Sequence, residues 1–185
     1  MNYITKIEII KGREWVKRAM YATQGKFCKA TKLTDKTFLR LLVARHSVIE
    51  EFEIWVDAIV PERVHTHIVR HKEIGKYVST SRPDISNSHP IENGMRKLSL
   101  RINAKRLLEI MDQRLCNKAW KETISLLTEI CNAMNQIDSS LYKAVTIPCV
   151  RFGYCPETNR TCGWIYSESF KKQREEWLEL INSLM

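Results

Sequence analysis

Seven residues in the first third of the chain, Phe52 to Ala58, alternate almost regularly between apolar and polar side chains. Successive side chains of a strand point to opposite faces, so this pattern predicts a strand with one buried face. A helix can begin soon afterwards at Pro61, because the backbone N–H that proline lacks would make no hydrogen bond within the first helical turn. We therefore expect a strand that is followed directly by a helix.

The stretch 60–84, which contains this helix, concentrates cationic and hydroxyl side chains. The helix would end near Gly75 and would carry four side chains at spacings of three and four: Arg63, His67, Arg70 and His71. A loop with hydroxyl groups and a further cation follows: Ser79, Thr80, Ser81 and Arg82. Guanidinium forks and short hydroxyl donors can hold phosphate, so this composition predicts an anion site.

A later predicted helix carries two polar residues, one at its start and one near its end. Asn103 is expected to cap a helix over 104–116, and Arg114 follows eleven residues after it. Eleven residues make about three helical turns, so both residues lie in nearly the same direction around the helix axis. The pair would converge on one elongated ligand.

Composition narrows the class of protein. With 185 residues and 44% hydrophobic content, the chain is expected to form a single domain over 1–185. The formal charge of +9 is compatible with a small anionic ligand or with a generally basic surface. We expect no nucleic-acid partner, because the cations form no dense run and no patch interleaved with aromatic residues. No signal peptide or membrane-spanning run is visible, so a cytoplasmic location without a membrane partner is expected.

Further helices are predicted over 12–23, 36–44, 118–137 and 167–184, and further strands over 3–10 and 97–102. The last helix would turn four apolar residues inward: Phe170, Trp177, Leu178 and Ile181. Between these two last helices, residues 145–165 form a turn-rich segment with three cysteines.

These three cysteines, Cys149, Cys155 and Cys162, suggest zinc, but they lack a local fourth ligand. Cys131 or another chain would have to complete such a site, and the alternative is that they are small thiols packed in a turn-rich tail. His67 and His71 share a helix face, yet no carboxylate triad or H-E-x-x-H accompanies them. We therefore predict no metal site.

Several motifs resemble those of flavin-dependent thymidylate synthases. Arg70-His71-Lys72 matches the family's R-H-R with lysine in the third place. Thr80 and Arg82 fall where the following S-x-R has its serine and its arginine. The sequence departs from the pattern at Tyr77 and Val78, where the family has Asn-Glu, and at His67, where glutamine is usual.

Two more segments, within a match that spans Arg45 to Glu122, extend the resemblance. Ser47 and Glu50 keep their places in the family's H-x-S-x-x-E-H segment, whereas Arg45 and Glu51 replace its two histidines. The family's second signature, an asparagine followed eleven residues later by an arginine, matches Asn103 and Arg114. Residues 119–122 partly match the A-Q-W-E that commonly follows this signature in the family, but the glutamine is missing.

The resemblance implies an α+β fold, with a small, mostly antiparallel sheet flanked by helices. It also implies a homotetramer whose active sites form between subunits. The implied enzyme is a methyltransferase that converts dUMP to dTMP by reductive methylation, with methylenetetrahydrofolate as carbon donor, FAD as flavin cofactor and NADPH as reductant.

The resemblance also implies roles for individual residues. FAD would be contacted by Arg70, His71, Lys72, Asn103, Ser47 and Glu50. The pyrimidine nucleotide would be contacted by His67, Ser79, Thr80, Arg82 and Arg114. Arg114 is the expected catalytic residue, because a guanidinium at a uracil carbonyl would stabilise negative charge that develops on the ring.

Two other functions remain open because of the departures at Tyr77 and Val78. A divergent relative would transfer hydroxymethyl instead of methyl, or act on dCMP. A non-catalytic relative would keep the nucleotide site and lose the flavin chemistry.

Overall fold

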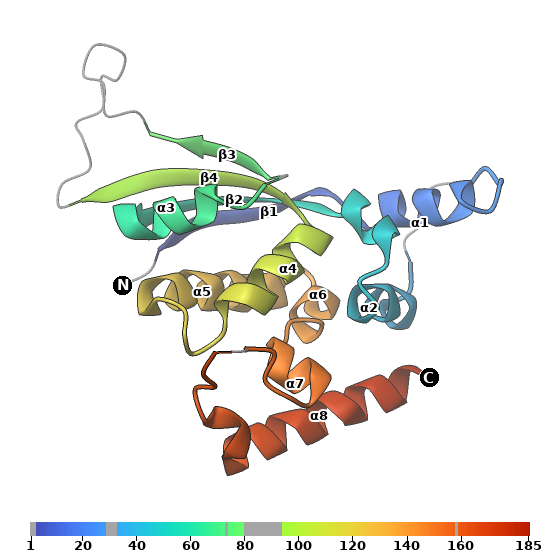
Figure 1. Ribbon diagram of the computed structural model, residues 1–185. Coiled ribbons are helices and arrows are strands. Elements are labelled where there is room, and N and C mark those ends of the chain that lie inside the picture. Colours follow the sequence, from blue (N-terminus) through green and yellow to red (C-terminus); the bar gives the residue numbers. More distant parts are fainter. Residues whose placement is uncertain (1–2, 29–32, 73, 80–93, 158) are drawn as a thin grey trace.

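The fold is built on one sheet of four strands in the order β1-β2-β4-β3, and neighbouring strands are all antiparallel (Figure 1). The computed structural model describes residues 3–28, 33–72, 74–79, 94–157 and 159–185. The strands are β1 (Ile4–Lys11), β2 (Glu53–Pro61), β3 (Gly75–Val78) and β4 (Met95–Asn103). The predicted fold class, a small antiparallel sheet flanked by helices, is confirmed.

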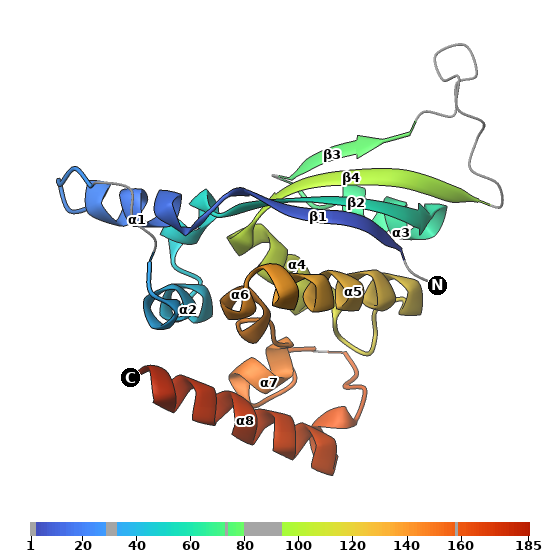
Figure 2. The same ribbon diagram turned by 180° about the vertical axis from the view of Figure 1, so that it is seen from behind.

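The alternation that predicted the central strand separates the two faces of β2. Ile54, Val56, Ala58 and Val60 are buried against the helices, and the strand continues to Pro61. On the opposite face the Trp55 ring stacks on Tyr77, with 5.4 Å between the ring centroids. Figures 1 and 2 show none of the described helices over that second face.

The helices lie mainly on one side of the sheet. Figures 1 and 2 show α4, α5 and α6 below it, with α7 and α8 as a further layer and α1 and α2 beyond one end. The α-helices are α1 (Arg13–Ala22), α2 (Asp35–Val43), α3 (Glu62–Val69), α4 (Ala104–Arg114), α5 (Lys121–Ile137), α6 (Ser139–Lys143), α7 (Pro148–Phe152) and α8 (Glu168–Leu184). Two 3-10 helices, η1 (Ser47–Glu51) and η2 (Trp164–Tyr166), complete the described elements. None of the described helices is long and apolar enough to cross a membrane.

Three sequence predictions were wrong in detail. The helix after Pro61 ends at Val69 and not at Gly75, because Gly75–Val78 forms β3 and pairs with β4. The turn-rich segment 145–165 contains α7, which begins at Pro148 and ends at Gly153 with φ +84°, a conformation that glycine adopts freely. Both elements are too short to show a hydrophobic period.

The third error concerns α8, which packs Phe170 and Trp177 into a small cluster with Val150 of α7. Phe170 and Trp177 are seven residues apart and therefore share a helix face. Leu178 lies one residue further round the helix and is 40% exposed, so the prediction that it points inward was wrong.

Candidate active site

Two predicted site residues meet where α3 and α4 end. His71 lies just after α3, and Arg114 is the last residue of α4. Arg114 donates a long hydrogen bond from Nε to Nε2 of His71, at 3.4 Å. Among the described residues, His71 is the one hydrogen-bond partner of the Arg114 guanidinium, so its terminal amino groups remain available to a ligand.

The surroundings of His71 favour its neutral form. Burial lowers the pKa of His71, and the positive charges of Arg114 and Lys76 lower it further. Lys76 itself is fixed, because its Nζ donates to the carbonyl oxygens of Val69 at 2.8 Å and His71 at 2.6 Å. A neutral imidazole can accept the hydrogen bond from Arg114 and so orient the guanidinium.

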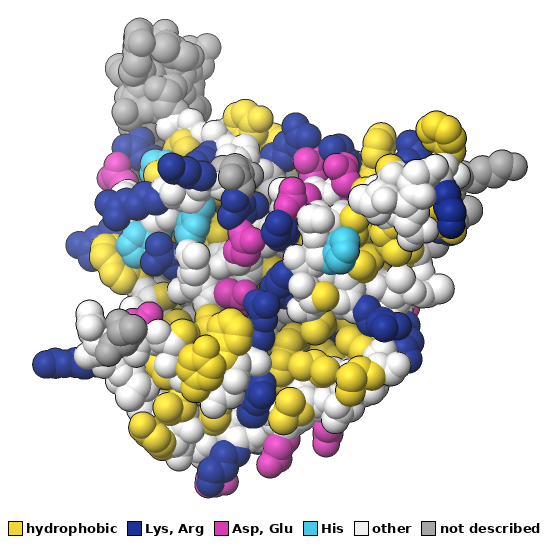
Figure 3. All heavy atoms as spheres, turned by 45° about the vertical axis from the view of Figure 1, so that its right-hand side comes forward, with side chains coloured by type: hydrophobic (Ala, Val, Ile, Leu, Met, Phe, Trp, Pro, Cys, Tyr) yellow, Lys and Arg dark blue, Asp and Glu magenta, His cyan; other side chains and the backbone are white. Residues whose placement is uncertain are grey.

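The rings of His67 and Trp120 form a partly exposed aromatic surface beside this pair, which we call the aromatic shelf. The His67 ring lies 4.3 Å from the Trp120 ring, centroid to centroid, and its Nδ1 is 3.2 Å from the hydroxyl of Thr123. Arg63 lies 5.7 Å from the Trp120 ring on the same side of the molecule. Burial, followed by the charges of Arg114 and Arg70, lowers the pKa of His67. Figure 3 shows histidine side chains among lysine and arginine side chains over α3.

Sequence reasoning assigned no role to Trp120 or Thr123. Trp120 precedes α5 and is 45% exposed, whereas Thr123 is buried in the first turn of that helix. The available sequence signal for Trp120 was its place in residues 119–122, which partly match the A-Q-W-E of the family.

The other residues predicted to bind FAD lie in two places. Arg70 caps α3 and is exposed like Lys72, so both flank His71. Asn103 lies at the opposite end of α4 from Arg114, about 16 Å away at 1.5 Å per residue. Its side-chain oxygen accepts from the backbone N–H of Arg106 at 2.9 Å, which confirms the predicted helix cap and leaves only its amide N–H groups for a ligand.

Ser47 and Glu50 also lie toward the Asn103 end of α4. Both belong to η1, and Glu50 accepts from Nζ of Lys105 at 2.6 Å. The structure therefore does not bring these residues together with His71 and Arg114 within one chain. Asn103 and Arg114 stand at opposite ends of α4, at the spacing of eleven residues that the sequence analysis used, so their convergence on one elongated ligand stays a prediction.

The residues predicted to hold the nucleotide phosphate are described only in part. Ser79 follows β3, and its hydroxyl accepts from the backbone N–H of Lys97 at 3.3 Å. Thr80 and Arg82 lie outside the described residues. Of the two departures from the family pattern, Tyr77 is 55% exposed and stacks on Trp55, whereas Val78 packs against the core.

Arg45, which replaces a histidine of the family pattern, serves the scaffold. Its guanidinium donates to the carbonyl oxygen of Leu42 at 2.8 Å, to that of Ala144 at 3.3 Å, and to Oδ1 of Asp112 at 3.0 Å. Oδ2 of Asp112 accepts from Arg151 at 3.1 Å. Burial raises the pKa of Asp112, and the two arginines offset part of that rise. This cluster ties α2, α6 and α7 to the end of α4.

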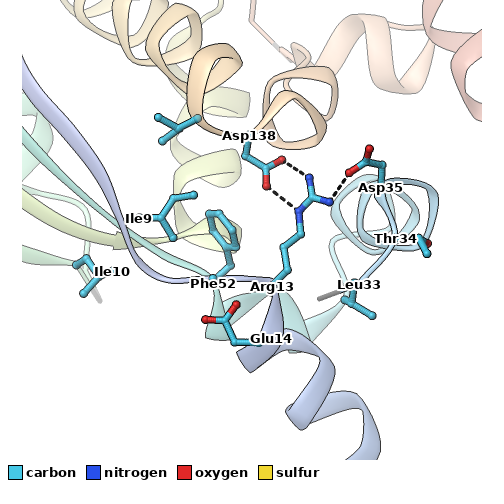
Figure 4. Close-up of a pocket in the computed structure, with 11 residues that line it drawn as sticks. Ile9, Ile10, Arg13, Glu14, Leu33, Thr34, Asp35, Phe52 and Asp138 are labelled. Atoms are coloured by element: carbon cyan, nitrogen blue, oxygen red, sulfur yellow. Dashed lines mark hydrogen bonds and ion pairs between the residues drawn. The ribbon is translucent and has the colours of Figure 1, made fainter. Parts of the chain in front are cut away.

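A cavity of about 660 Å³ lies elsewhere, between β1, α1 and α2 (Figure 4). Arg13 crosses it and bonds to both oxygens of Asp138, through Nε at 2.7 Å and a terminal nitrogen at 2.8 Å, and also to Asp35. None of the predicted site residues lines it. Because its one lining cation, Arg13, is already paired with Asp35 and Asp138, we interpret it as a structural cavity.

No family model matches this sequence, and no curated protein matches it either. Solved structures do match. Flavin-dependent thymidylate synthase ThyX from Helicobacter pylori, complexed with FAD and dUMP, has a TM-score of 0.58 at 13% identity, covering 78% of this chain and 99% of its own. The UMP/dUMP methylase PolB from Streptomyces cacaoi, bound with 5-Br dUMP, has a TM-score of 0.56 at 12% identity, covering 75% of this chain and 93% of its own.

Identities this low show the fold alone. This chain has the fold of the flavin-dependent thymidylate synthases, as the resemblance of its motifs predicted.

Proposed function

We propose that this protein is a flavin-dependent thymidylate synthase that converts dUMP to dTMP with methylenetetrahydrofolate, NADPH and FAD. The observation that carries the proposal is the Arg114–His71 pair beside the exposed shelf of His67 and Trp120. The solved structures of similar fold contain dUMP or its 5-bromo derivative, which supports a pyrimidine nucleotide as substrate.

The chemistry of the described side chains fits these ligands. The exposed cations Arg70 and Lys72 flank His71, where they would bind the diphosphate of FAD. FAD, when bound, supplies the electrons that reduce the transferred carbon to a methyl group. The free amino groups of Arg114 would donate to a uracil carbonyl and stabilise the negative charge that makes the ring carbon nucleophilic. The neutral His71 holds that guanidinium in place from the other side.

The separation of the candidate site residues supports an active site shared between subunits, as in the proposed homotetramer. Asn103, Ser47 and Glu50 lie toward one end of α4, and Arg114 lies at the other. A flavin site that contacts both Asn103 with its neighbours and Arg114 would therefore be formed by residues of different subunits. None of the described helices covers the second face of the sheet, so that face would be available for such contacts.

The second candidate is a related enzyme that modifies another pyrimidine nucleotide, by hydroxymethyl transfer or on dCMP. Val78 favours it, because an apolar side chain stands where the family pattern has a carboxylate. A non-catalytic nucleotide-binding relative is distinguished from both by purification without flavin.

The test is anaerobic turnover with FAD, NADPH, methylenetetrahydrofolate and either dUMP or dCMP, with products identified by mass. We expect dTMP from dUMP, and we expect Arg114→Ala to lower kcat by about 10² to 10³-fold, since one lost donor costs ~3 to 4 kcal/mol. Arg40→Ala is the matched control, because Arg40 is exposed on α2. Normal turnover by Arg114→Ala would refute the assignment, and a product other than dTMP would favour the second candidate.

A further inference from the structure

Four of the six cysteines line one cavity of about 360 Å³ at the end of α4. They come from three parts of the chain: the loop after α4, helix α7, and the segment 153–163. In that order they are Cys116, Cys149, and the pair Cys155 and Cys162. Cys116 is thus the fourth neighbour that the three cysteines of the tail lack in the sequence.

The two remaining cysteines have different surroundings. Cys131 is buried in the main core, where its Sγ lies 3.7 Å from Sδ of Met111, and it does not line this cavity. Burial raises the pKa of Cys131 to about 12, so it behaves as a small apolar side chain. The four cavity cysteines are half-buried or exposed, so packing alone does not explain them.

We propose that this chain binds one structural zinc ion through four thiolates, those of Cys116, Cys149, Cys155 and Cys162. Four thiolates in a tetrahedron are the ligand set of closed structural zinc sites. Binding converts four thiols and one Zn²⁺ into a tetrathiolate complex of charge −2, and releases four protons to solvent. No electron transfer is involved.

The local charges suit a complex of that sign. Arg114 lines the same cavity, and Asp112 beside it has both oxygens engaged by Arg45 and Arg151. The Asp112 carboxylate is therefore occupied as an acceptor, the Glu157 carboxylate of the lining is paired with Lys118, and Arg114 supplies positive charge to the cavity.

Metal binding requires the cavity to close. In the present arrangement of the described residues, no three histidine, cysteine or carboxylate side chains are placed to hold a metal ion. Zn–S bonds of about 2.3 Å require sulfur atoms within about 3.8 Å of one another. Among residues 153–157 and 159–163, Cys155 is half-buried and the others are exposed, so little side-chain packing opposes such a movement.

One contact already holds the two sides of the cavity near each other. Nζ of Lys118 lies 3.5 Å from Oε2 of Glu157, so an ion pair joins the loop that carries Cys116 to the segment that carries Cys155. An exposed pair of this kind contributes little to stability. A zinc ion would fix the segment on the end of α4 far more firmly, because its binding energy is coupled to local folding.

The experiment measures metal and not turnover, so its result is independent of the proposed enzyme activity. The untagged chain, reduced and supplied with zinc, should retain about one zinc per chain after gel filtration, by mass spectrometry of the metal. Replacement by Co²⁺ should give the charge-transfer absorption of thiolate–cobalt bonds. Zinc should protect four thiols of the folded protein from a thiol reagent, and a chelator should expose them.

Serine variants identify the ligands. Cys116→Ser and Cys155→Ser should each lower zinc affinity by at least about tenfold. Cys28→Ser is the matched control, because Cys28 lies outside the cavity, and it should bind zinc normally. Circular dichroism checks that each variant remains folded. No zinc retained by the reduced wild-type chain, zinc retained equally by both variants, or a mass loss that reveals disulfides among the four cysteines would overturn the proposal.

Discussion

Asp112 provides a test of how the end of α4 is held, because Arg114 lies only two residues beyond it. Its two carboxylate oxygens accept from Arg45 at 3.0 Å and from Arg151 at 3.1 Å. The side chains of Arg45 and Asp112 are only 10% and 16% exposed, so solvent screens their attraction weakly. Asp112→Asn keeps the shape and one acceptor oxygen but removes the negative charge between two arginines.

Removal of one partner from a buried ion pair typically costs 3 to 5 kcal/mol. Arg151 is 28% exposed and Asn keeps one hydrogen bond, so the lower end applies and we expect a loss of ~3 kcal/mol. For a chain of this size that lowers Tm by about 6 to 12 °C. Urea unfolding followed by circular dichroism at 222 nm measures the free energy directly.

Glu168→Gln is the matched control, because its pair with Lys171 is largely exposed, with side chains 86% and 59% accessible. That change should cost less than about 1 kcal/mol. A loss below about 1 kcal/mol for Asp112→Asn as well would show that the cluster does not carry the stability assigned to it.

Two further predictions concern pH and the cavity of Figure 4. Burial lowers the pKa of His71 below 6.5, so the unfolded chain binds protons there that the folded chain does not. The free energy of unfolding should be unaffected by His71 above about pH 6.5 and should fall as the pH decreases from there toward the lowered pKa. In His71→Gln this fall should be less steep. Equal pH dependence of the unfolding free energy in the two proteins would contradict the lowered pKa of His71. Asp138 accepts from Arg13 and also caps α6 through the backbone N–H groups of Ser140 and Leu141. Asp138→Ala should be less stable than Asp138→Asn by ~1 kcal/mol, because asparagine retains the cap; equal unfolding free energies would exclude that role.

The sequence predicted best those helices and strands that show a local hydrophobic period or a recognisable cap. The alternation around Trp55 identified β2, and the cap at Asn103 identified the start of α4. The sequence could not identify β3, because four residues that pair with a strand twenty residues away show no pattern of their own. The same reason applies to α7, where Pro148 and Gly153 mark the ends of a helix of five residues.

The sequence could propose candidate site residues but could not show which of them contact each other. His71 and Arg114 were identified separately, by two motifs 43 residues apart, and only the tertiary structure brings them together. The neighbours of Trp120 and Cys116 could not be predicted because they are distant in sequence: His67 for the first, and the cysteines after 148 for the second. Contacts between such segments are not encoded in local spacing.

Arg45 shows that a residue at a motif position need not have the chemical role of the residue that the family pattern has there. The family pattern has histidine there, and the sequence offers a larger, permanently charged group. With φ of +53°, the residue takes a left-handed conformation that directs the chain from α2 into η1. Its guanidinium is committed to Leu42, Ala144 and Asp112, so it serves the scaffold on which Arg114 stands. Arg45 therefore has a structural role among the described residues, whereas the proposed ligand contacts rest on Arg114, whose described hydrogen bond uses only its Nε.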